Sequence, residues 1–310
     1  METIYITHPL FRLHEMGAEH PEAPFRLDAI DTQLQRTGLA DLLRFLQAKK
    51  ATDEDLLRVH SLHHIANLKQ NAPQDGYYSI DADTRLNVHT LEAAYHAAGA
   101  GLLAVDEVFS TTSRTAFCAV RPPGHHACFD QAMGFCFFNN IAVAAAYALE
   151  KYELDQVVIV DFDVHHGNGT EDIFAHNDKV QMFGFYQHPL FPGSRHSPPA
   201  ANMYNEPVPA GADSATIRHI VNTYWLPQLR QLKPKLLLIS AGFDAHQDDE
   251  MGQLQLGDED FAWITQQVMQ ATTESTQGRV ISMLEGGYDP ASLSRSVQAH
   301  LQVLAGLVNG

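Results

Sequence analysis

Side chains that can bind a metal ion occur close together in this 310-residue sequence. Asp163 and His165 lie two residues apart in Asp-Phe-Asp-Val-His-His, and Asp244 follows an apolar run that ends at Ser240. If the first stretch is a strand, residues i and i+2 point to the same face and both side chains reach one ion. Asp244 would then complete a set of three protein ligands. Three ligands leave a coordination position for water or substrate, which is typical of a catalytic site.

The same aspartates have a simpler interpretation. Either Asp163 or Asp244 alone would more often cap the loop that follows its strand, and only the combination with His165 favours metal binding. Two carboxylates and one imidazole suit zinc, and they suit iron(II) or cobalt as well. The ligand set therefore predicts a divalent transition metal without choosing among these ions.

A pair of adjacent histidines could supply acid and base catalysis. His125 and His126 follow Arg-Pro-Pro-Gly, which predicts a loop of restricted path in which both side chains can face one pocket. Each imidazole needs a partner that sets its tautomer, and Asp161 and Asn168 are the candidates. A lone histidine pair would more often be an exposed surface feature, but this pair follows a predicted strand.

Tyr288 could donate a hydrogen bond to a developing oxyanion. The two glycines before it, in Glu-Gly-Gly-Tyr, let the backbone bend so that the phenol turns inward. Hydrolysis of an amide needs activated water, a base and such a donor. Alone, Tyr288 would more often be a core tyrosine; together with the other clusters it indicates a metal-dependent amide hydrolase.

Strand-like and helix-like segments alternate along the chain. Runs rich in β-branched and aromatic residues predict strands at Thr3 to Ile6, Thr115 to Val120, Gln156 to Val164, Val180 to Tyr186, Lys235 to Ser240 and Arg279 to Leu284. Helical apolar spacing predicts helices at Thr90 to Val108, Asn140 to Leu149, Ala215 to Leu232, Asp258 to Ala271 and Pro290 to Leu304. This alternation predicts an α/β fold with a doubly wound, mostly parallel sheet and helices on both faces. Ligands bind such sheets beyond the carboxyl ends of the strands, where the clusters above occur.

Composition limits the function classes. With 37 acidic and 20 basic residues the formal charge is -17, which disfavours direct binding to nucleic acid or an anionic membrane. The sequence has no linker-like tract, so we expect one catalytic domain over residues 1–310. Three cysteines without C-x-x-C spacing and the lack of a signal-like or membrane-spanning segment predict a cytoplasmic protein. A homo-oligomer is left open.

Several motifs, in this order along most of the chain, resemble the histone deacetylase superfamily, which has the arginase-deacetylase fold. They are HPEAPFRL, VHSLHHI, RPPGHHA, GFCFFNN, DFDVHHGNGT, HPLFPG, AGFDAHQDD and LEGGYDP. Asn168 matches the class II pattern, where class I members carry aspartate. The lack of long insertions resembles the compact bacterial-type, histone deacetylase-like amidohydrolases.

The resemblance implies roles for the clustered residues. Asp163, His165 and Asp244 would hold zinc, and His126 would act as general base and then acid. His125 would be its electrostatic partner, and Tyr288 would polarise the scissile carbonyl.

The resemblance also implies a substrate site. Phe135 and Phe191 would form the walls of a narrow tunnel, the Gly134 carbonyl would accept the substrate amide N–H, and Asp83 would be a rim carboxylate. Polyamine specialists of the family resemble one another in carrying a glutamate seven residues after the third metal ligand. Met251 occupies that position here.

A potassium ion is the second ion that the resemblance implies. It would be bound by Asp161 and by the backbone carbonyls of Asp163 and His165, with a serine hydroxyl from the next strand. Alignment places Gly184 at the position of that serine, so the side-chain part of this site is in question.

The expected function is a zinc-dependent deacetylase that acts on acyl-lysine or a related amine. An acetylpolyamine amidohydrolase is the alternative on the same scaffold. A non-catalytic acyl-ligand binding protein would have lost a ligand, the histidine pair or the tyrosine, and none is missing. An arginase-like hydrolase would need further carboxylates for a second bridging metal.

Overall fold

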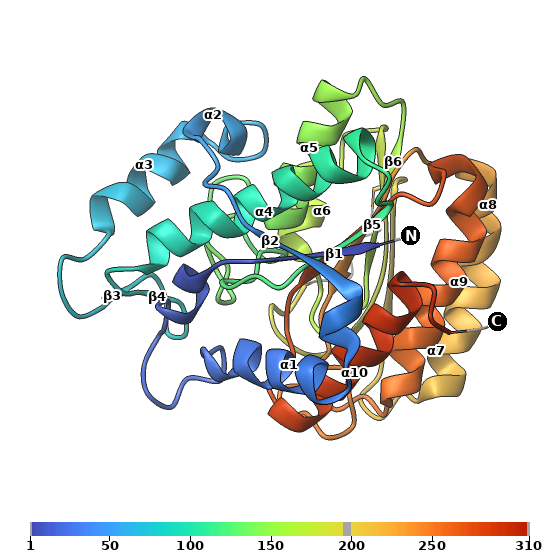
Figure 1. The fold of residues 1–310 in the computed structure, drawn as a ribbon. Helices are drawn as coiled ribbons and strands as arrows, with labels where there is room; N and C mark the ends of the chain where they lie inside the picture. The colour runs from blue at the N-terminus through green and yellow to red at the C-terminus, as the bar shows by residue number, and fades with distance from the viewer. Residues whose placement is uncertain (1, 195–199, 309–310) are drawn as a thin grey trace.

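A parallel eight-stranded sheet forms the centre of the structure, which is a computed structural model describing residues 2–194 and 200–308 (Figure 1). Its strands are β1 (Thr3–Thr7), β2 (Leu43–Gln47), β5 (Thr115–Cys118), β6 (Val157–Asp161), β7 (Val180–Gln187), β8 (Met203–Val208), β9 (Leu237–Ala241) and β10 (Val280–Leu284). They lie in the order β2-β1-β5-β10-β9-β6-β7-β8, and every pairing is parallel. A separate antiparallel pair joins β3 (Tyr78–Ser79) and β4 (Arg85–Leu86). The predicted α/β class with a parallel sheet is confirmed.

The sheet order explains why the polar motifs meet. The strands β5, β10, β9 and β6 are adjacent in that order, and each is followed by one of the clusters found in the sequence. Because the strands are parallel, the four following loops emerge at the same edge of the sheet. Residues far apart in the chain are thereby brought to one place.

Helices cover both faces of the sheet. They are α1 (Phe25–Arg36), α2 (Asp53–Leu56), α3 (Leu62–Asn71), α4 (Thr90–Ser110), α5 (Asn140–Lys151), α6 (Asn168–Phe174), α7 (Ser214–Ile220), α8 (Leu226–Leu232), α9 (Asp258–Thr276) and α10 (Pro290–Leu304), with short 3-10 turns at Pro9–Arg12 and Leu39–Leu42. The helices α4 and α5 pack together on one face, while α1, α10, α9 and α8 form a layer on the other (Figure 1). The arrangement is the predicted doubly wound one.

The helix predicted over Ala215 to Leu232 is not a regular α-helix. A π-helical turn, Val221–Trp225, separates α7 from α8, and the Leu226 N–H donates to the carbonyl of Val221. Pro227 in the next position has no N–H to donate, and its ring crowds the preceding turn. The apolar spacing predicted a helical segment correctly, but the proline accompanies a π-helical turn in the middle of that segment.

Two edge strands and one strand end also differ from the sequence analysis. It did not predict the outermost strands, β2 and β8, where most side chains are half-buried or exposed and no continuous apolar run forms. Pro207 in β8 is compatible with an edge position, where a missing N–H costs no ladder bond. The strand predicted over Gln156 to Val164 ends at Asp161 in β6.

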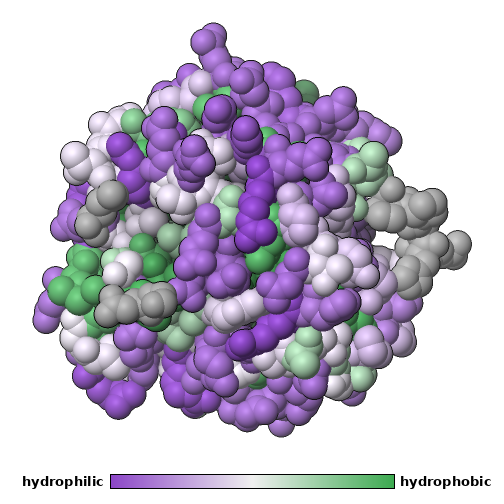
Figure 2. Space-filling model, turned by 90° about the vertical axis from the view of Figure 1, so that its right-hand side faces the viewer, coloured by the Kyte–Doolittle hydropathy of each residue, from purple (hydrophilic) through white to green (hydrophobic). Residues whose placement is uncertain are grey.

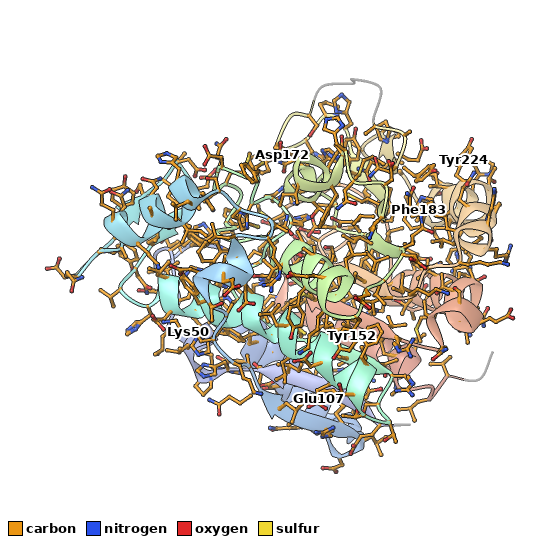
Figure 3. All side chains as sticks on the ribbon, turned by 90° about the horizontal axis from the view of Figure 1, so that it is seen from above. Lys50, Glu107, Tyr152, Asp172, Phe183 and Tyr224 are labelled. Carbon is orange, nitrogen blue, oxygen red and sulfur yellow. The ribbon has the colours of Figure 1, made fainter. Side chains whose placement is uncertain are left out.

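The interior lies between the sheet and the two helical layers. Phe183 of β7 is fully buried, whereas Tyr224, in the π-helical turn that packs over this part of the sheet, is exposed; both are labelled in Figure 3. The Phe183 ring stacks on that of Tyr204, with 4.6 Å between the centroids. The outer face over α7 to α9 carries mostly polar side chains, with apolar ones in patches between them (Figure 2). Among the described residues, no helix is long and apolar enough to cross a membrane.

Candidate metal-dependent active site

The three predicted metal ligands lie together at the carboxyl edge of the sheet. Asp163, His165 and Asp244 are buried, and one ligand atom of each lies within 4.8 Å of the others. The Nδ1 atom of His165 is 3.0 Å from Asp163 Oδ1 and 3.2 Å from Asp244 Oδ2. The loops after β6 and β9 therefore build one cluster of two carboxylates and one imidazole.

The expected reason for the convergence of Asp163 and His165 is wrong. β6 ends at Asp161, so the two side chains do not share the face of a strand. They belong to a loop in which Asp163 Oδ1 accepts the N–H of His165 at 2.9 Å. Local folding of the loop around this carboxylate, rather than strand alternation, turns both groups inward.

The aspartates also cap backbone groups, but only Asp163 does so within the loop after its own strand, as the simpler interpretation predicted, and both aspartates reach loops after other strands. Asp163 Oδ2 accepts the N–H of Gly286 at 2.9 Å, and Asp244 Oδ1 accepts the N–H of Val164 at 3.0 Å. A Cβ atom on Gly286 would lie 2.0 Å from Asp244 Oδ2. A side chain at this position would therefore fill the space that the carboxylate occupies.

The residues fit a divalent cation. Asp244 Oδ2 is buried and accepts no hydrogen bond from any described residue, because the nearby His165 Nδ1 is not aligned with it. Burial and the charge of Asp163 raise the pKa of Asp244 to about 7. Two buried carboxylates whose ligand oxygens lie within 4.8 Å of each other repel, and a cation between them removes that repulsion. The open lone pair of Asp244 and the nearby His165 nitrogen supply ligands for one ion.

The histidine pair has the predicted partners. His126 Nδ1 lies 2.7 Å from Asn168 Oδ1, and His125 Nδ1 lies 3.0 Å from Asp161 Oδ2. An amide oxygen only accepts, so His126 donates from Nδ1 and keeps a free lone pair on Nε2. The two rings are 4.0 Å apart between centroids.

The pKa values of the two imidazoles are shifted in opposite directions. Burial, followed by the charges of His125 and His165, lowers the pKa of His126 well below its usual value. Burial also disfavours charge on His125, but Asp163 and Asp161 outweigh it and raise the pKa of His125 well above its usual value. These shifts favour a neutral His126 beside a positively charged His125, and such a difference between neighbouring groups is typical of acid–base sites.

A cavity of about 330 Å³ opens onto these groups. His126, His165 and Tyr288 line its inner part. All five predicted substrate residues line it as well: Asp83, Gly134, Phe135, Phe191 and Met251.

The backbone at the cavity wall is unusual. Phe135 has φ 69° and follows Gly134 with φ 57°, so two successive residues lie in the left-handed region. Non-glycine residues adopt this conformation at an energetic cost that is often found at functional sites. The Phe135 N–H donates to Thr84 Oγ1 at 3.1 Å, which fixes the turn to the Asp83 loop.

Glu285 is a site residue that the sequence analysis missed. It is fully buried, and its Oε2 accepts the N–H groups of Gly124 at 2.7 Å and His125 at 3.1 Å. Burial raises the pKa of Glu285 to about 7. The signal was present as the first residue of Glu-Gly-Gly-Tyr, but its partners lie about 160 residues away in sequence.

Asp249 is a second residue beside the site whose role the sequence analysis did not predict. Only 4% of the residue is exposed, and its Oδ2 accepts the N–H groups of Tyr288 at 2.6 Å and Asp289 at 3.2 Å. Its Oδ1 accepts the N–H of Met251 at 3.0 Å. The carboxylate ties the loop after β9 to the loop that carries Tyr288.

A buried ionic cluster supports the same loop from the other side. Arg26 donates to the carbonyls of Gly287 at 2.6 Å and Glu285 at 2.5 Å, and its guanidinium lies 4.9 Å from the centre of the Tyr288 ring. Glu22 accepts from both Arg26 and Arg121, and all three side chains are fully buried. These residues come from HPEAPFRL and RPPGHHA, whose ionic contacts the sequence analysis did not predict.

Comparisons with known proteins agree with this geometry. A sequence model of the histone deacetylase domain matches residues 20–304. The chain is 38% identical over 300 residues to an uncharacterised protein of Synechocystis, covering 95% of this chain and 96% of that one. It is 33% identical to the histone deacetylase-like amidohydrolase of Pseudomonas aeruginosa, covering 94% and 78% respectively. The crystal structure of the HDA15 HD domain superposes with a TM-score of 0.91 at 32% identity, covering 98% of this chain and 88% of that one.

The extent of these matches defines the protein class. The chain belongs to the histone deacetylase family, and it has the arginase-deacetylase fold. A probable deacetylase of Archaeoglobus fulgidus, 31% identical over 296 residues and covered to 82% of its length, is another relative. The resemblance stated from the motifs is confirmed.

Proposed function

We propose that this protein is a zinc-dependent deacylase that removes acetyl, or another short acyl group, from the side-chain amine of acyl-lysine or a related amine. The observation that carries the proposal is the buried cluster of Asp163, His165 and Asp244 at the inner end of a cavity that His126 and Tyr288 also line. Iron(II) or cobalt would fit the same ligands. The catalytic domain would span residues 1–310.

The ligand set would hold a divalent ion that supplies Lewis-acid polarisation of the scissile carbonyl and the attacking water. His126 would take the water proton on Nε2, which its bond to Asn168 leaves free, and return it to the leaving amine. Tyr288 would donate its hydroxyl proton in a hydrogen bond to the developing oxyanion. His125, positively charged beside Asp161, would stabilise negative charge in this pocket.

The cavity supports a slim acyl-alkyl substrate. Phe135 and Phe191 would enclose the methylene chain, the Gly134 carbonyl would accept the amide N–H, and Asp83 would contact the substrate at the rim. Met251 offers apolar contact in place of the charge expected for a polyamine enzyme. We therefore favour acyl-lysine, and acetylpolyamine hydrolysis remains the alternative.

A potassium ion would be bound by Asp161 and the backbone carbonyls of Asp163 and His165. The three cysteines, which are free thiols, support a cytoplasmic location. The net charge of -17 argues against direct nucleic-acid binding and against an anionic membrane surface, and a homo-oligomer stays open.

A panel assay tests the substrate. Purified protein is given acetyl-lysine peptides, N-acetylputrescine, acetylspermidine and peptides with longer acyl chains, and released amine is measured at low and high salt. We expect the highest kcat/KM on acetyl-lysine peptides. A tenfold preference for a polyamine that persists at high salt would replace this proposal by the alternative.

Metal content is measured on the same preparations. We expect one equivalent of a divalent transition metal in the wild type and loss of both metal and activity in Asp244→Ala. Asp248→Ala, which removes an exposed carboxylate from the same loop, is the matched control and should keep both. Full metal occupancy and turnover in Asp244→Ala would show that the ligand assignment is wrong.

A further inference from the structure

One buried oxygen near the proposed active site has no partner. Asn205 Oδ1 is inaccessible to solvent, and no described residue donates a hydrogen bond to it. An unpaired buried amide oxygen costs on the order of 1 to 3 kcal/mol. Its position therefore calls for a bound cation or a water molecule.

The orientation of the Asn205 amide is fixed by its other end. Nδ2 donates to Glu171 Oε2 at 2.6 Å, and His166 Nε2 lies 3.4 Å from the same nitrogen. Turning the amide over would place Oδ1 against a carboxylate. The oxygen consequently points away from Glu171 and toward the neighbouring strand.

Gly184 provides the space into which Asn205 Oδ1 points. Asp161, Gly184 and Asn205 occupy paired positions on the adjacent strands β6, β7 and β8. A Cβ atom on Gly184 would lie 2.8 Å from Asn205 Oδ1 and 3.4 Å from the carbonyl oxygen of Asp161. Two acceptor oxygens thus border the space that a side chain at position 184 would fill.

Gly184 is also the position where the family resemblance expects a serine. Without that hydroxyl, the potassium site expected around Asp161 would lose a ligand from β7. The Asn205 side chain reaches across Gly184 from β8 and brings an amide oxygen to the same space. The serine hydroxyl that is absent at position 184 and the Asn205 oxygen therefore belong to the same space.

The chemistry of these oxygens favours a monovalent ion. The Asn205 and Asp161 oxygens that border the space are neutral carbonyl oxygens, which are the ligands of potassium in protein sites. The Asp161 carboxylate already accepts from His125 Nδ1 and from the N–H of Asp163 at 3.1 Å. A divalent ion would require more negative charge among its ligands.

We propose that Asn205 Oδ1 is the side-chain ligand that completes a monovalent cation site with Asp161, in place of the serine that Gly184 replaces. This inference goes beyond the proposed hydrolysis, because a cation here links β6 to β8 whatever reaction the protein catalyses. Its test uses stability rather than activity, so the two proposals fail independently.

The experiment measures the melting temperature in potassium chloride and in choline chloride at equal ionic strength, with sodium and lithium chloride for comparison. A ligand that binds only the native state raises the melting temperature in a saturable way. At a concentration several times the dissociation constant, potassium should raise the melting temperature of the wild type by roughly 2 °C or more. We expect Asn205→Ala to lose most of this potassium-specific shift.

Two further variants separate the oxygen from its surroundings. Glu171→Gln changes the partner of Asn205 Nδ2 but leaves Oδ1 in place, so it should keep the shift. Gly184→Ser combined with Asn205→Ala removes the oxygen that would crowd a Cβ and restores the serine hydroxyl, so it should recover the shift. Equal melting temperatures of the wild type in potassium and choline chloride would overturn the inference and leave a water as the partner of Asn205. A full potassium shift in Asn205→Ala would overturn it as well.

Discussion

Adjacent histidines of this site differ because their partners differ. Asn168 offers His126 a neutral oxygen, so burial dominates and the pKa of His126 falls well below its usual value. Asp161 offers His125 a carboxylate within a buried acidic cluster, and the pKa of His125 rises. The asparagine thus keeps His126 in the neutral form that a general base requires.

Tyr288→Phe tests the oxyanion donor. The change removes one hydroxyl and keeps the ring that contacts Phe135 and Arg26. We expect kcat to fall by about 10²-fold or more, the size found when one oxyanion donor is removed, with metal content and melting temperature unchanged. Tyr204→Phe, which removes the hydroxyl of a tyrosine in β8, is the control and should be fully active. Wild-type turnover in Tyr288→Phe would remove this residue from the mechanism.

Glu285 predicts a pH dependence of stability. Burial raises the pKa of Glu285 to about 7, above its value in an unfolded chain. The native state therefore retains a proton that the unfolded state has lost, and stability falls as pH rises from about 4.5 to about 7. The full effect is up to about 3 kcal/mol.

Glu285→Gln should flatten that part of the pH profile. The glutamine oxygen can still accept from Gly124 and His125, and Ser240 Oγ, 3.3 Å from Oε1, can accept from its amide. In chelator-treated protein, we expect variant and wild type to be equally stable near pH 4.5 and the variant to be more stable at pH 8. Parallel profiles from pH 4.5 to 8 in urea unfolding would contradict the assignment.

At the scale of elements, loops from distant parts of the chain are joined by side chains that cap backbone groups. Asp249 in the loop after β9 accepts two N–H groups of the loop after β10, and Arg26 of α1 donates to two carbonyls there. Tyr288 lies between these two supports. Its position therefore depends on contacts with segments other than β10 and α10, the two elements between which Tyr288 lies in the chain.

Asp249→Asn should misplace Tyr288. An amide has one acceptor oxygen, so either the Tyr288 and Asp289 N–H groups or the Met251 N–H loses its partner. Displacements of about 1 Å near reacting groups can cost up to 10²-fold in rate, so we expect kcat to fall about tenfold or more with little change in KM. The matched control, Asp248→Asn, removes an exposed carboxylate one residue earlier and should behave as wild type. Equal kinetics of the two variants would show that Asp249 does not position Tyr288.

At the scale of the whole molecule, the net charge of -17 would act on the proposed substrate before binding. The cavity mouth carries Asp81 and Asp83, so a cationic acyl-amine is attracted both over distance and at the rim. Salt screens such attraction over about 10 Å at 0.1 M. In the proposed function the field would affect association, while Met251 and the aromatic walls would act after the substrate has entered.

Salt should therefore separate substrates by charge. We expect kcat/KM for a lysine-rich acetylated peptide to fall several-fold between 20 mM and 300 mM salt, and that for an uncharged peptide to change little. Asp83→Asn should weaken this salt dependence without removing it, because one rim charge of many is lost. Identical salt profiles for the two peptides would show that the field does not steer substrate.

The sequence by itself determined the class of fold and the residue types of the site. Alternating strand and helix patterns predicted a parallel sheet, and the clusters after the strands marked its functional edge. Local motifs indicated the triad and the histidine pair with its partners Asp161 and Asn168, while the family resemblance indicated the cavity residues. The structure brings these residues together because the motifs of the triad and of the histidine pair follow strands of one parallel sheet.

Only the tertiary structure decided how the motifs support one another. Glu285 and His125 meet because β10 lies beside β5, and Asn205 meets Gly184 because β8 pairs with β7. The burial of Asp249 beside Tyr288 depends on the packing of two loops. The physical reason is that a buried N–H or oxygen takes whichever partner the packed chain brings within about 3 Å, and local sequence patterns do not encode that distance.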